Sequence, residues 1–401
     1  MDEGMDAVLE NIGGRAGLGG VTMAAAYHHG RDIFPHNPRR KVHFLEGGTV
    51  FFQPDPARYS GRVLQPIVSD LVHKHGDVLA SLCNAASRRS MGVRAWTVFL
   101  HNYTLGEAHP ECASRNVFGD AHQTDLCPSN PEVRAYATAL AADVASKGVH
   151  AVVAESLHFH GLEHGFHHER YFIELGSLGR YLLGLCFCQH CLAAARERGV
   201  DVDRLQGEAQ SELERRFAAP AADEPTELDR ANVEAFADGE LGGYLTSRAW
   251  TVASLVSECA QAATLAGGAP LVFIDLSGAV KGYATGRPEG DAAPSIAWQF
   301  GIDVGMIAES CGQIEAIGYA ADPDRLRLDL EAYSSTIGDP EIASLSVILR
   351  PMAPDCDSVE NLARKLQIAR DAGVGEVGFY HYGLMRLESL DLIRSALNAM
   401  G

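Results

Sequence analysis

The sequence predicts an α/β fold: a (β/α)8 TIM-like barrel with a helical insertion after an early barrel strand. Short β-rich runs alternate with amphipathic helical runs, which is typical of parallel βα units. The chain of 401 residues is long for one average domain but suits a barrel that carries insertions. Seven strands are expected at 21–27, 94–101, 150–155, 271–276, 314–320, 345–350 and 377–382.

The eighth strand of the barrel is placed within 42–52. Its Gly47-Gly48 pair is also typical of a hairpin turn, which is the alternative for this segment. Seven clear strands and this one favour a barrel, and a doubly wound open sheet is the alternative.

Three helices have recognisable starts. Asn130-Pro131-Glu132 supplies a capping side chain, a proline at the first helical position and an acid in the first turn. Asp322-Pro323 repeats this arrangement, and Asp357 with Glu360 forms a variant of the capping box. Asp322 and Asp357 each follow an expected strand after a short interval, as βα loops require.

The whole chain, 1–401, is interpreted as one barrel domain, and residues 159–268 as a helical insertion within it. This segment is too long for a single crossover between strands. It holds a cysteine cluster, expected helices at 202–216 and 230–265, and a polar linker at 218–227.

The composition limits the kinds of molecule that the protein is expected to bind. Lys plus Arg number 33 against 52 Asp plus Glu, a formal net charge of −19, which argues against nucleic acid and anionic membranes. We expect no signal peptide or membrane span. Nine cysteines, most of them scattered, favour the reducing cytoplasm over a disulfide framework. A small-molecule partner is expected, and a homo-oligomer is compatible with the sequence.

The carboxyl ends of the expected strands carry imidazole, aromatic, amide and guanidinium groups. Since the strand ends of a barrel meet at one mouth, we expect these groups to bind substrate. Such a mixture suits a polyhydroxylated, carbohydrate-like ligand, with Arg350 available for an anionic substituent. The alternative is that several of them cap the barrel. The predicted substrate-binding residues are His28, His101, Asn102, His158, His160, Arg350, Tyr380 and His381.

Two acids are predicted to be catalytic, Glu155 and Asp275, because each ends a buried apolar run. Loss of hydration raises the pKa of such a carboxyl toward values useful for proton transfer. Cleavage of a glycoside needs two carboxyl groups, one as acid and one as nucleophile or base. Glu46 and Asp125 are weaker alternatives, and an ion pair with Arg350 is the structural alternative for Glu155.

Histidines are dense just after Glu155. His164 and His168 would share one helix face and could bind a metal ion, with His167 beside them. The segment lacks the His-Glu-x-x-His pattern of zinc peptidases, so histidines that hold a loop and contact substrate are favoured. A metal-dependent hydrolase or lyase that uses this loop is the rival function.

Cys186, Cys188 and Cys191 lie within six positions, a spacing that allows their thiolates to converge on one soft cation. A closed tetrahedral zinc site needs a fourth donor, and both His190 and Cys127 are candidates. Such a zinc ion would be structural and would tie the insertion to the barrel. The alternative is that these cysteines are small buried hydrophobic residues.

These residues together resemble a family of glycoside-hydrolase-like barrel proteins. The resemblance rests on Cys127-Pro128-Ser129-Asn130-Pro131-Glu132, on the strand that ends in Glu155, and on the Cys-x-Cys-x-x-Cys cluster that follows. It covers about a quarter of the chain. It implies a TIM barrel, a carbohydrate-related substrate and a functional role for Glu155. A carbohydrate-binding barrel without turnover is a further alternative.

Overall fold

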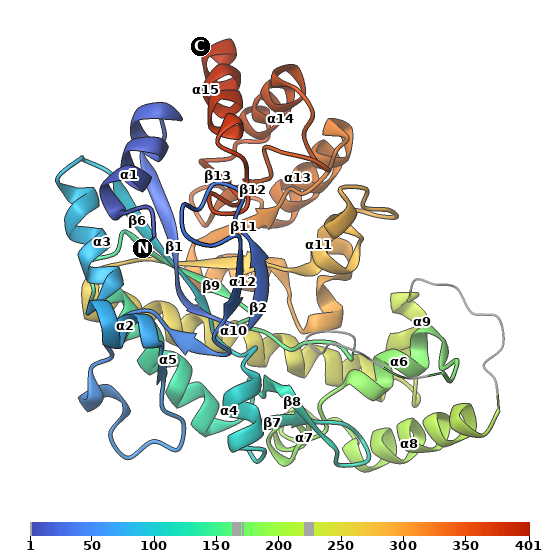
Figure 1. Cartoon of the computed structure of the whole chain (residues 1–401). Helices are drawn as coiled ribbons and strands as arrows, with labels where there is room; N and C mark the ends of the chain where they lie inside the picture. The colour runs from blue at the N-terminus through green and yellow to red at the C-terminus, as the bar shows by residue number, and fades with distance from the viewer. Residues whose placement is uncertain (1, 163–169, 171, 220–227) are drawn as a thin grey trace.

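The computed structural model describes all residues except 1, 163–169, 171 and 220–227, and it shows a mixed α/β fold with a mostly parallel central sheet (Figure 1). Within the described residues, the largest sheet has nine strands in the order β13-β12-β11-β10-β9-β6-β1-β4-β5. Its strands are β1 (Gly20–Tyr27), β4 (Thr49–Val50), β5 (Ile67–Val68), β6 (Gly92–Val98), β9 (Ala151–Glu155), β10 (Leu271–Asp275), β11 (Gln313–Ile317), β12 (Ser344–Leu349) and β13 (Glu376–Phe379).

All seven clearly expected strands are confirmed, and they pair in parallel as β1, β6, β9, β10, β11, β12 and β13. Several end earlier than expected. β6 ends at Val98, β11 at Ile317 and β13 at Phe379, so the polar residues after them lie in loops. Loops at the carboxyl ends of parallel strands are where α/β enzymes keep their functional groups.

The expected eighth parallel strand at 42–52 is wrong. The segment is split: β3 (Val42–Leu45) pairs with β2 (Gly30–Ile33) in a separate hairpin, whereas β4 pairs antiparallel with β1. The glycines between them make the break. Gly48 has a φ of +66°, and a Cβ there would lie 2.1 Å from Oδ1 of Asn102, so only glycine fits. A second hairpin joins β7 (Ala113–Arg115) to β8 (Ala121–Leu126).

The central sheet is strongly curled. In the sheet order, β6 and β13 are separated by four strands, which would place them more than about 20 Å apart in a flat sheet. Arg94 of β6 nevertheless reaches both Glu315 of β11 and Glu376 of β13, with N–O distances of 2.8 Å each. Side chains of distant strands therefore meet on the inner face. No pairing between β13 and β1 is present among the described strands.

Helices cover the outer face of the sheet, and those near the C-terminus stand together at one end (Figure 1). Those outside the segment between β9 and β10 are α1 (Met5–Leu9), α2 (Asp70–His75), α3 (Val78–Ser87), α4 (Tyr103–Ala108), α5 (Pro131–Ala145), α11 (Ser277–Val280), α12 (Val304–Cys311), α13 (Pro323–Ile337), α14 (Val359–Asp371) and α15 (Glu388–Met400), with short π or 3₁₀ turns at Glu10–Arg15, Pro56–Tyr59, Tyr283–Thr285 and Ala293–Phe300.

Two of the predicted helix starts are confirmed. Asn130 and Asp322 each accept a hydrogen bond at the start of their helices, α5 and α13. The prediction at Asp357 is wrong by one residue, because the hydroxyl of Ser358 accepts from the backbone N–H of Asn361 and caps α14. Asp357 instead accepts a hydrogen bond from that hydroxyl.

Between β9 and β10 lie α6 (Gly176–Gly184), α7 (Gln189–Arg196), α8 (Val202–Ala218), α9 (Arg230–Ala235) and α10 (Glu240–Gly267). The helix expected at 202–216 is confirmed. The one expected at 230–265 is two helices, because Ala237 and Asp238 adopt positive φ and end the first. Residues 220–227 of the expected linker lie outside the described residues.

The long helix α10 packs along α5 on the outside of the sheet. Arg134 of α5 donates hydrogen bonds to Ser254 and Glu258 of α10. This contact holds α10, the last helix before β10, against α5 on the outside of the sheet. In the described parts of the chain, none of the helices has both the length and the apolar character that crossing a membrane requires.

The inner ion pairs give a first prediction. Arg94→Ala should lower the free energy of unfolding by about 3–5 kcal/mol, because Glu315 is buried and would lose its charged partner. Glu376→Gln is the matched control and should cost less than about 1 kcal/mol, since the Glu376 side chain is 48% exposed. Urea unfolding of the three proteins measures both. Equal losses in the two variants would contradict the role of the buried pair.

Candidate active site

Glu155 is the last residue of β9 and is buried. The indole N–H of Trp96, on the neighbouring strand β6, donates a hydrogen bond to its carboxyl oxygen Oε2. Burial raises the pKa of Glu155 to about 7, although the Trp96 hydrogen bond and the charge of His101 act in the opposite direction. A carboxyl group with this pKa can both give and take a proton near neutral pH.

Aromatic rings from several strands surround this acid. Ring centroids are 6.2 Å apart for Tyr27 and Trp96, 5.5 Å for Trp96 and Tyr380, and 5.8 Å for Tyr319 and Tyr380. These rings are partly exposed, whereas Glu155 is buried. Burial and the nearby Glu155 raise the pKa of the Tyr27 phenol, which therefore remains a hydrogen-bond donor.

The backbone turns sharply directly after the acid. Ser156 is a buried non-glycine residue with a φ of +57°, a left-handed conformation that costs about 1–3 kcal/mol outside glycine. Its hydroxyl has no hydrogen-bond partner in the described part of the chain. Backbone strain of this kind is concentrated at functional sites, because the surrounding structure must hold it in place.

A second buried group lies near Glu155 and consists of His101, Asp125 and His160. One carboxylate oxygen of Asp125, Oδ1, is 3.4 Å from Nδ1 of His101 and 3.1 Å from Nδ1 of His160. Burial alone would raise the pKa of Asp125, but the charge of His160 and hydrogen bonds from both imidazoles hold it well below its usual range. An ionised carboxylate between two imidazoles can orient a base or hold a cation.

The backbone places two members of this group next to each other. His101 and Asp125 form an isolated antiparallel bridge, so the segment that follows β6 pairs with the end of β8. His160 comes from the loop after β9 and completes the group from the other side. We define the His101–Asp125–His160 group as the histidine–aspartate cluster.

Of the other predicted histidines, His28 and His158 lie beside this cluster, and His381 lies beside Tyr380. The ring of His28 is 5.2 Å from that of His101, and the ring of His158 is 4.8 Å from that of His160. Burial lowers the pKa of His28 and of His381 to about 4, so both are neutral at pH 7. Neutral imidazoles can donate and accept hydrogen bonds, as a hydroxyl-rich ligand requires.

The fold does not place the Asp275 side chain next to that of Glu155. In the register of the sheet, Phe273 of β10 lies opposite Ala154 of β9, and paired residues share a face. Asp275, two residues after Phe273, lies on that same face. Glu155, one residue after Ala154, lies on the opposite one. The prediction that these two acids flank one cavity is therefore not supported by the register.

The hydrogen bonds of Asp275 agree with this placement. Its Oδ2 accepts from the hydroxyl of Tyr333 on the outer helix α13 at 2.6 Å, and its Oδ1 accepts from the backbone N–H and hydroxyl of Ser277. Burial raises the pKa of Asp275, and these hydrogen bonds oppose the shift. The carboxyl group joins β10 to its covering helix, which is a structural role.

Two predicted substrate-binding residues also have structural partners. Asn102 caps α4 by accepting from the N–H of Leu105, and it donates to the carbonyl of Gly48. Arg350 makes a two-pronged ion pair with Asp355, with N–O distances of 2.6 Å, and its guanidinium lies 4.4 Å from the ring of Tyr319.

Other predicted groups lie elsewhere. Arg350 pairs with Asp355, so the structure does not show the alternative ion pair between Arg350 and Glu155. Glu46 accepts a hydrogen bond from the backbone of Asp70, at the start of α2. The predicted metal-binding residues His164, His167 and His168 lie outside the described residues.

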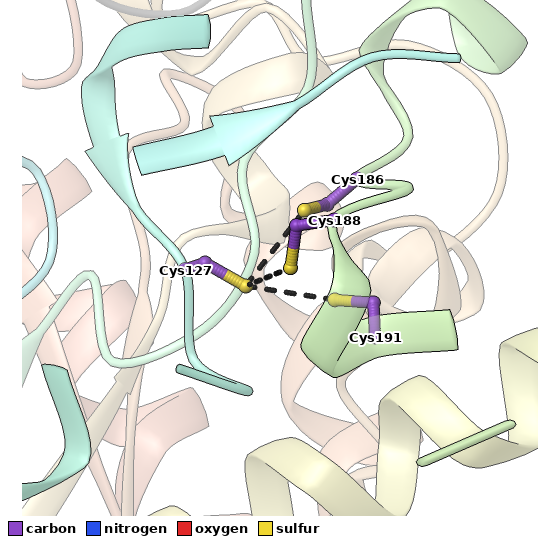
Figure 2. A group of neighbouring side chains, drawn as sticks. All are labelled: Cys127, Cys186, Cys188 and Cys191. Atoms are coloured by element: carbon purple, nitrogen blue, oxygen red, sulfur yellow. Dashed lines mark hydrogen bonds between the residues drawn. The ribbon is translucent and has the colours of Figure 1, made fainter. Parts of the chain in front are cut away.

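Four buried cysteines converge where the segment after β8 meets the start of α7. Figure 2 shows Cys127, from the segment after β8, facing Cys186 and Cys188, which precede α7, and Cys191 in the first turn of α7. Sulfur–sulfur distances from Cys127 are 3.5 Å to Cys188, 3.5 Å to Cys191 and 3.7 Å to Cys186. All four can present a ligand atom to one ion.

His190, the other candidate fourth donor, is not part of this group. Its Nε2 lies 3.3 Å from the side-chain amide nitrogen of Gln189 instead. The sequence also missed one site residue, Trp96. Its position follows only from the strand register of the structure, in which Trp96 is two residues from Val98, the partner of Glu155, and so shares its face of the sheet.

Comparisons with known proteins support the fold. No protein-family model and no curated protein matches this chain in sequence. Among solved structures, α-L-fucosidase isoenzyme 2 from Paenibacillus thiaminolyticus matches with a TM-score of 0.50 and 11% identity, over 99% of this chain and 46% of that one. A β-galactosidase from the psychrophilic Marinomonas ef1 matches with a TM-score of 0.48 and 10% identity, over 80% and 51%.

The chain thus spans about half the length of these two structures. At 11% identity, the fucosidase shows that this chain has a glycoside-hydrolase-like fold. It does not assign an activity, which has to be argued from the site.

The environment of Glu155 predicts an unusual pH dependence of stability. The folded protein keeps this proton up to a pH of about 7, whereas an unfolded chain releases it near 4.5, so the contribution of Glu155 to stability falls as the pH rises between these values. Glu155→Gln does not titrate. Its stability relative to the wild type should therefore improve from pH ~4 to pH ~8, by up to about 3 kcal/mol.

Urea unfolding across this pH range measures the difference. Trp96 provides an independent signal, because ionisation of its hydrogen-bond partner should change its fluorescence with a midpoint near pH ~7 in the wild type only. A stability difference between the two proteins that does not vary with pH would show that Glu155 has an ordinary pKa.

Proposed function

We propose that this chain is a glycoside-hydrolase-like enzyme that cleaves a small glycoside or polyol derivative, with Glu155 as the group that transfers the proton. The observation that carries the proposal is a buried carboxyl with a pKa of about 7 at the end of β9, surrounded by partly exposed aromatic rings. An acid that is protonated near neutral pH can protonate the leaving oxygen of a glycosidic bond.

The surrounding groups suit such a substrate. Tyr27, Trp96 and Tyr380 offer ring faces and edges for the apolar side of a sugar, and the neutral imidazoles of His28 and His381 offer hydrogen bonds to hydroxyls. The curled sheet and the fucosidase likeness support a TIM-like barrel as the scaffold, formed by the whole chain with 159–268 as its insertion.

The second reacting group in this proposal is the histidine–aspartate cluster, because Asp275 faces away. An imidazole held by Asp125 can accept a proton from an attacking water while Glu155 protonates the leaving oxygen. The water then forms the new bond at the anomeric carbon as the glycosidic bond breaks, so two proton transfers balance the hydrolysis.

We also propose that the four-cysteine group binds one structural zinc ion. Zinc–sulfur bonds of about 2.3 Å in a tetrahedron require sulfur–sulfur distances of about 3.8 Å. Distances of 3.5 to 3.7 Å from Cys127 fit this requirement without rearrangement. The ion would join the segment after β8 to α7. We further propose that the protein works in a reducing compartment such as the cytoplasm, where these thiols would stay reduced.

The activity prediction concerns Glu155→Gln. This change keeps the shape of the side chain but removes the transferable proton, so kcat on a responsive aryl glycoside should fall by about 10²–10⁴-fold. Retained binding, measured by calorimetry with the same glycoside, would separate loss of chemistry from loss of the site. A chain that binds sugars without turnover would show binding in both proteins and hydrolysis in neither.

Two controls sharpen this experiment. Glu107→Gln alters an exposed acid on α4 and should leave kcat unchanged. Asp275→Asn removes a buried hydrogen-bond acceptor, so it should lower the melting temperature and change kcat little. A fall in kcat for Asp275→Asn as large as that for Glu155→Gln would contradict the placement of Asp275 on the outer face.

The zinc prediction is about one equivalent of zinc per chain in protein purified without chelators, measured by elemental analysis. Cys127→Ser should lose most of this zinc and much of the stability, because three thiolates remain without their fourth partner. Cys83→Ser, on α3, is the matched control and should keep the full zinc content. Zinc-free wild-type protein in reduced form would refute the proposal.

A further inference from the structure

We propose that the histidine–aspartate cluster is a second metal site, separate from the cysteines, that binds one divalent first-row transition ion. His101, Asp125 and His160 are all buried, and each presents a ligand atom, all within 4.8 Å of one another. Two imidazoles and one carboxylate are a ligand set that suits such ions and leaves coordination positions open.

The distances inside the cluster fit coordination. Bonds of about 2.1 Å from a metal to nitrogen and oxygen place neighbouring ligand atoms about 3.0 Å apart in an octahedron and about 3.4 Å apart in a tetrahedron. The two Nδ1 atoms lie 3.1 and 3.4 Å from the same oxygen of Asp125. Both imidazoles thus approach one carboxylate oxygen at the spacing of ligands that share an ion.

The surroundings hold the ligands in place. The backbone bridge fixes His101 relative to Asp125, and the hydroxyl of Thr124 donates to the second carboxylate oxygen, Oδ2, at 3.0 Å. Outer hydrogen bonds of this kind orient metal ligands and leave the other oxygen for the ion. The cluster therefore has both the ligand atoms and the supporting contacts of a preformed metal site.

The inference deepens the proposed function and, for its role in catalysis, rests on it. Open positions on such an ion would take a water molecule or hydroxyl oxygens of the sugar, on the side of the site where His101 acts electrostatically on Glu155. With an ion bound, the two imidazoles would be its ligands and could not act as the base, so water held by the ion would take the place of the imidazole as the second reacting group. Metal binding itself is independent of whether Glu155 is catalytic.

Mn²⁺ is the best probe, because it prefers oxygen and nitrogen ligands and avoids the four thiolates. Wild-type protein is first treated with chelator until no more than one zinc per chain remains, and it is then titrated with Mn²⁺ while electron paramagnetic resonance counts the free ion. We expect saturable binding of one Mn²⁺ per chain. Asp125→Asn and His160→Gln should each weaken it by at least about 100-fold.

His150→Gln, which removes an exposed imidazole, is the control and should bind Mn²⁺ like the wild type. Absence of saturable binding, or binding that survives in both cluster variants, overturns the proposal. If the variants do not fold, cadmium NMR of the wild type decides instead: a nitrogen- and oxygen-bound resonance beside the thiolate-bound one supports the second site, and a thiolate resonance alone refutes it.

This test and the test of the proposed function can fail separately. Loss of Mn²⁺ binding in the cluster variants together with an active Glu155→Gln would retain the metal site and remove Glu155 from the chemistry. The opposite pair of results, no Mn²⁺ binding and an inactive Glu155→Gln, would retain the proton-transferring acid and leave the cluster without an ion.

Discussion

The curvature of the parallel sheet is the constraint on which the rest of the structure depends. Arg94 connects the inner faces of β6, β11 and β13, which only a tightly curled sheet can bring within hydrogen-bonding distance. The same curvature places Tyr380, after the last strand, against Trp96 of β6. Glu155 owes its aromatic surroundings to this approach, because no two neighbouring strands could supply them alone.

Burial favours the uncharged forms of the side chains in this site, and at one carboxylate the neighbouring imidazoles outweigh it. It favours the protonated form of Glu155 and the neutral forms of His28 and His381, since each loses hydration that would stabilise its charge. Asp125 is buried too, yet its imidazole neighbours keep it ionised. The result is a partly protonated acid near a charged carboxylate, a difference between two carboxyl groups that acid–base chemistry at neutral pH can use.

The sequence predicted the positions of seven strands because buried parallel strands are continuous apolar runs that stand out from amphipathic helices. Local patterns also indicated that Glu155 would end a buried strand and that Cys186, Cys188 and Cys191 would converge, as they do. The roles of these residues stay predictions. The sequence failed where the outcome depends on the register of the sheet. The end of a strand does not reveal on which face its last side chain lies, so the sequence placed Asp275 on the wrong face. β8 was missed because 121–126 is polar, and with it the pairing that joins Asp125 to His101.

One residue, Leu126, separates Asp125 from Cys127. The backbone of this short stretch is clamped on both sides, by Leu100 at Leu126 and by Cys112 at Cys127. These backbone hydrogen bonds hold the two peptide units between the four-cysteine group and Asp125 in place, so the two groups are rigidly linked. Thiol reagents that disturb the four cysteines would therefore also displace Asp125 and the histidines beside it, so sensitivity to mercurials or oxidants would not identify a cysteine nucleophile.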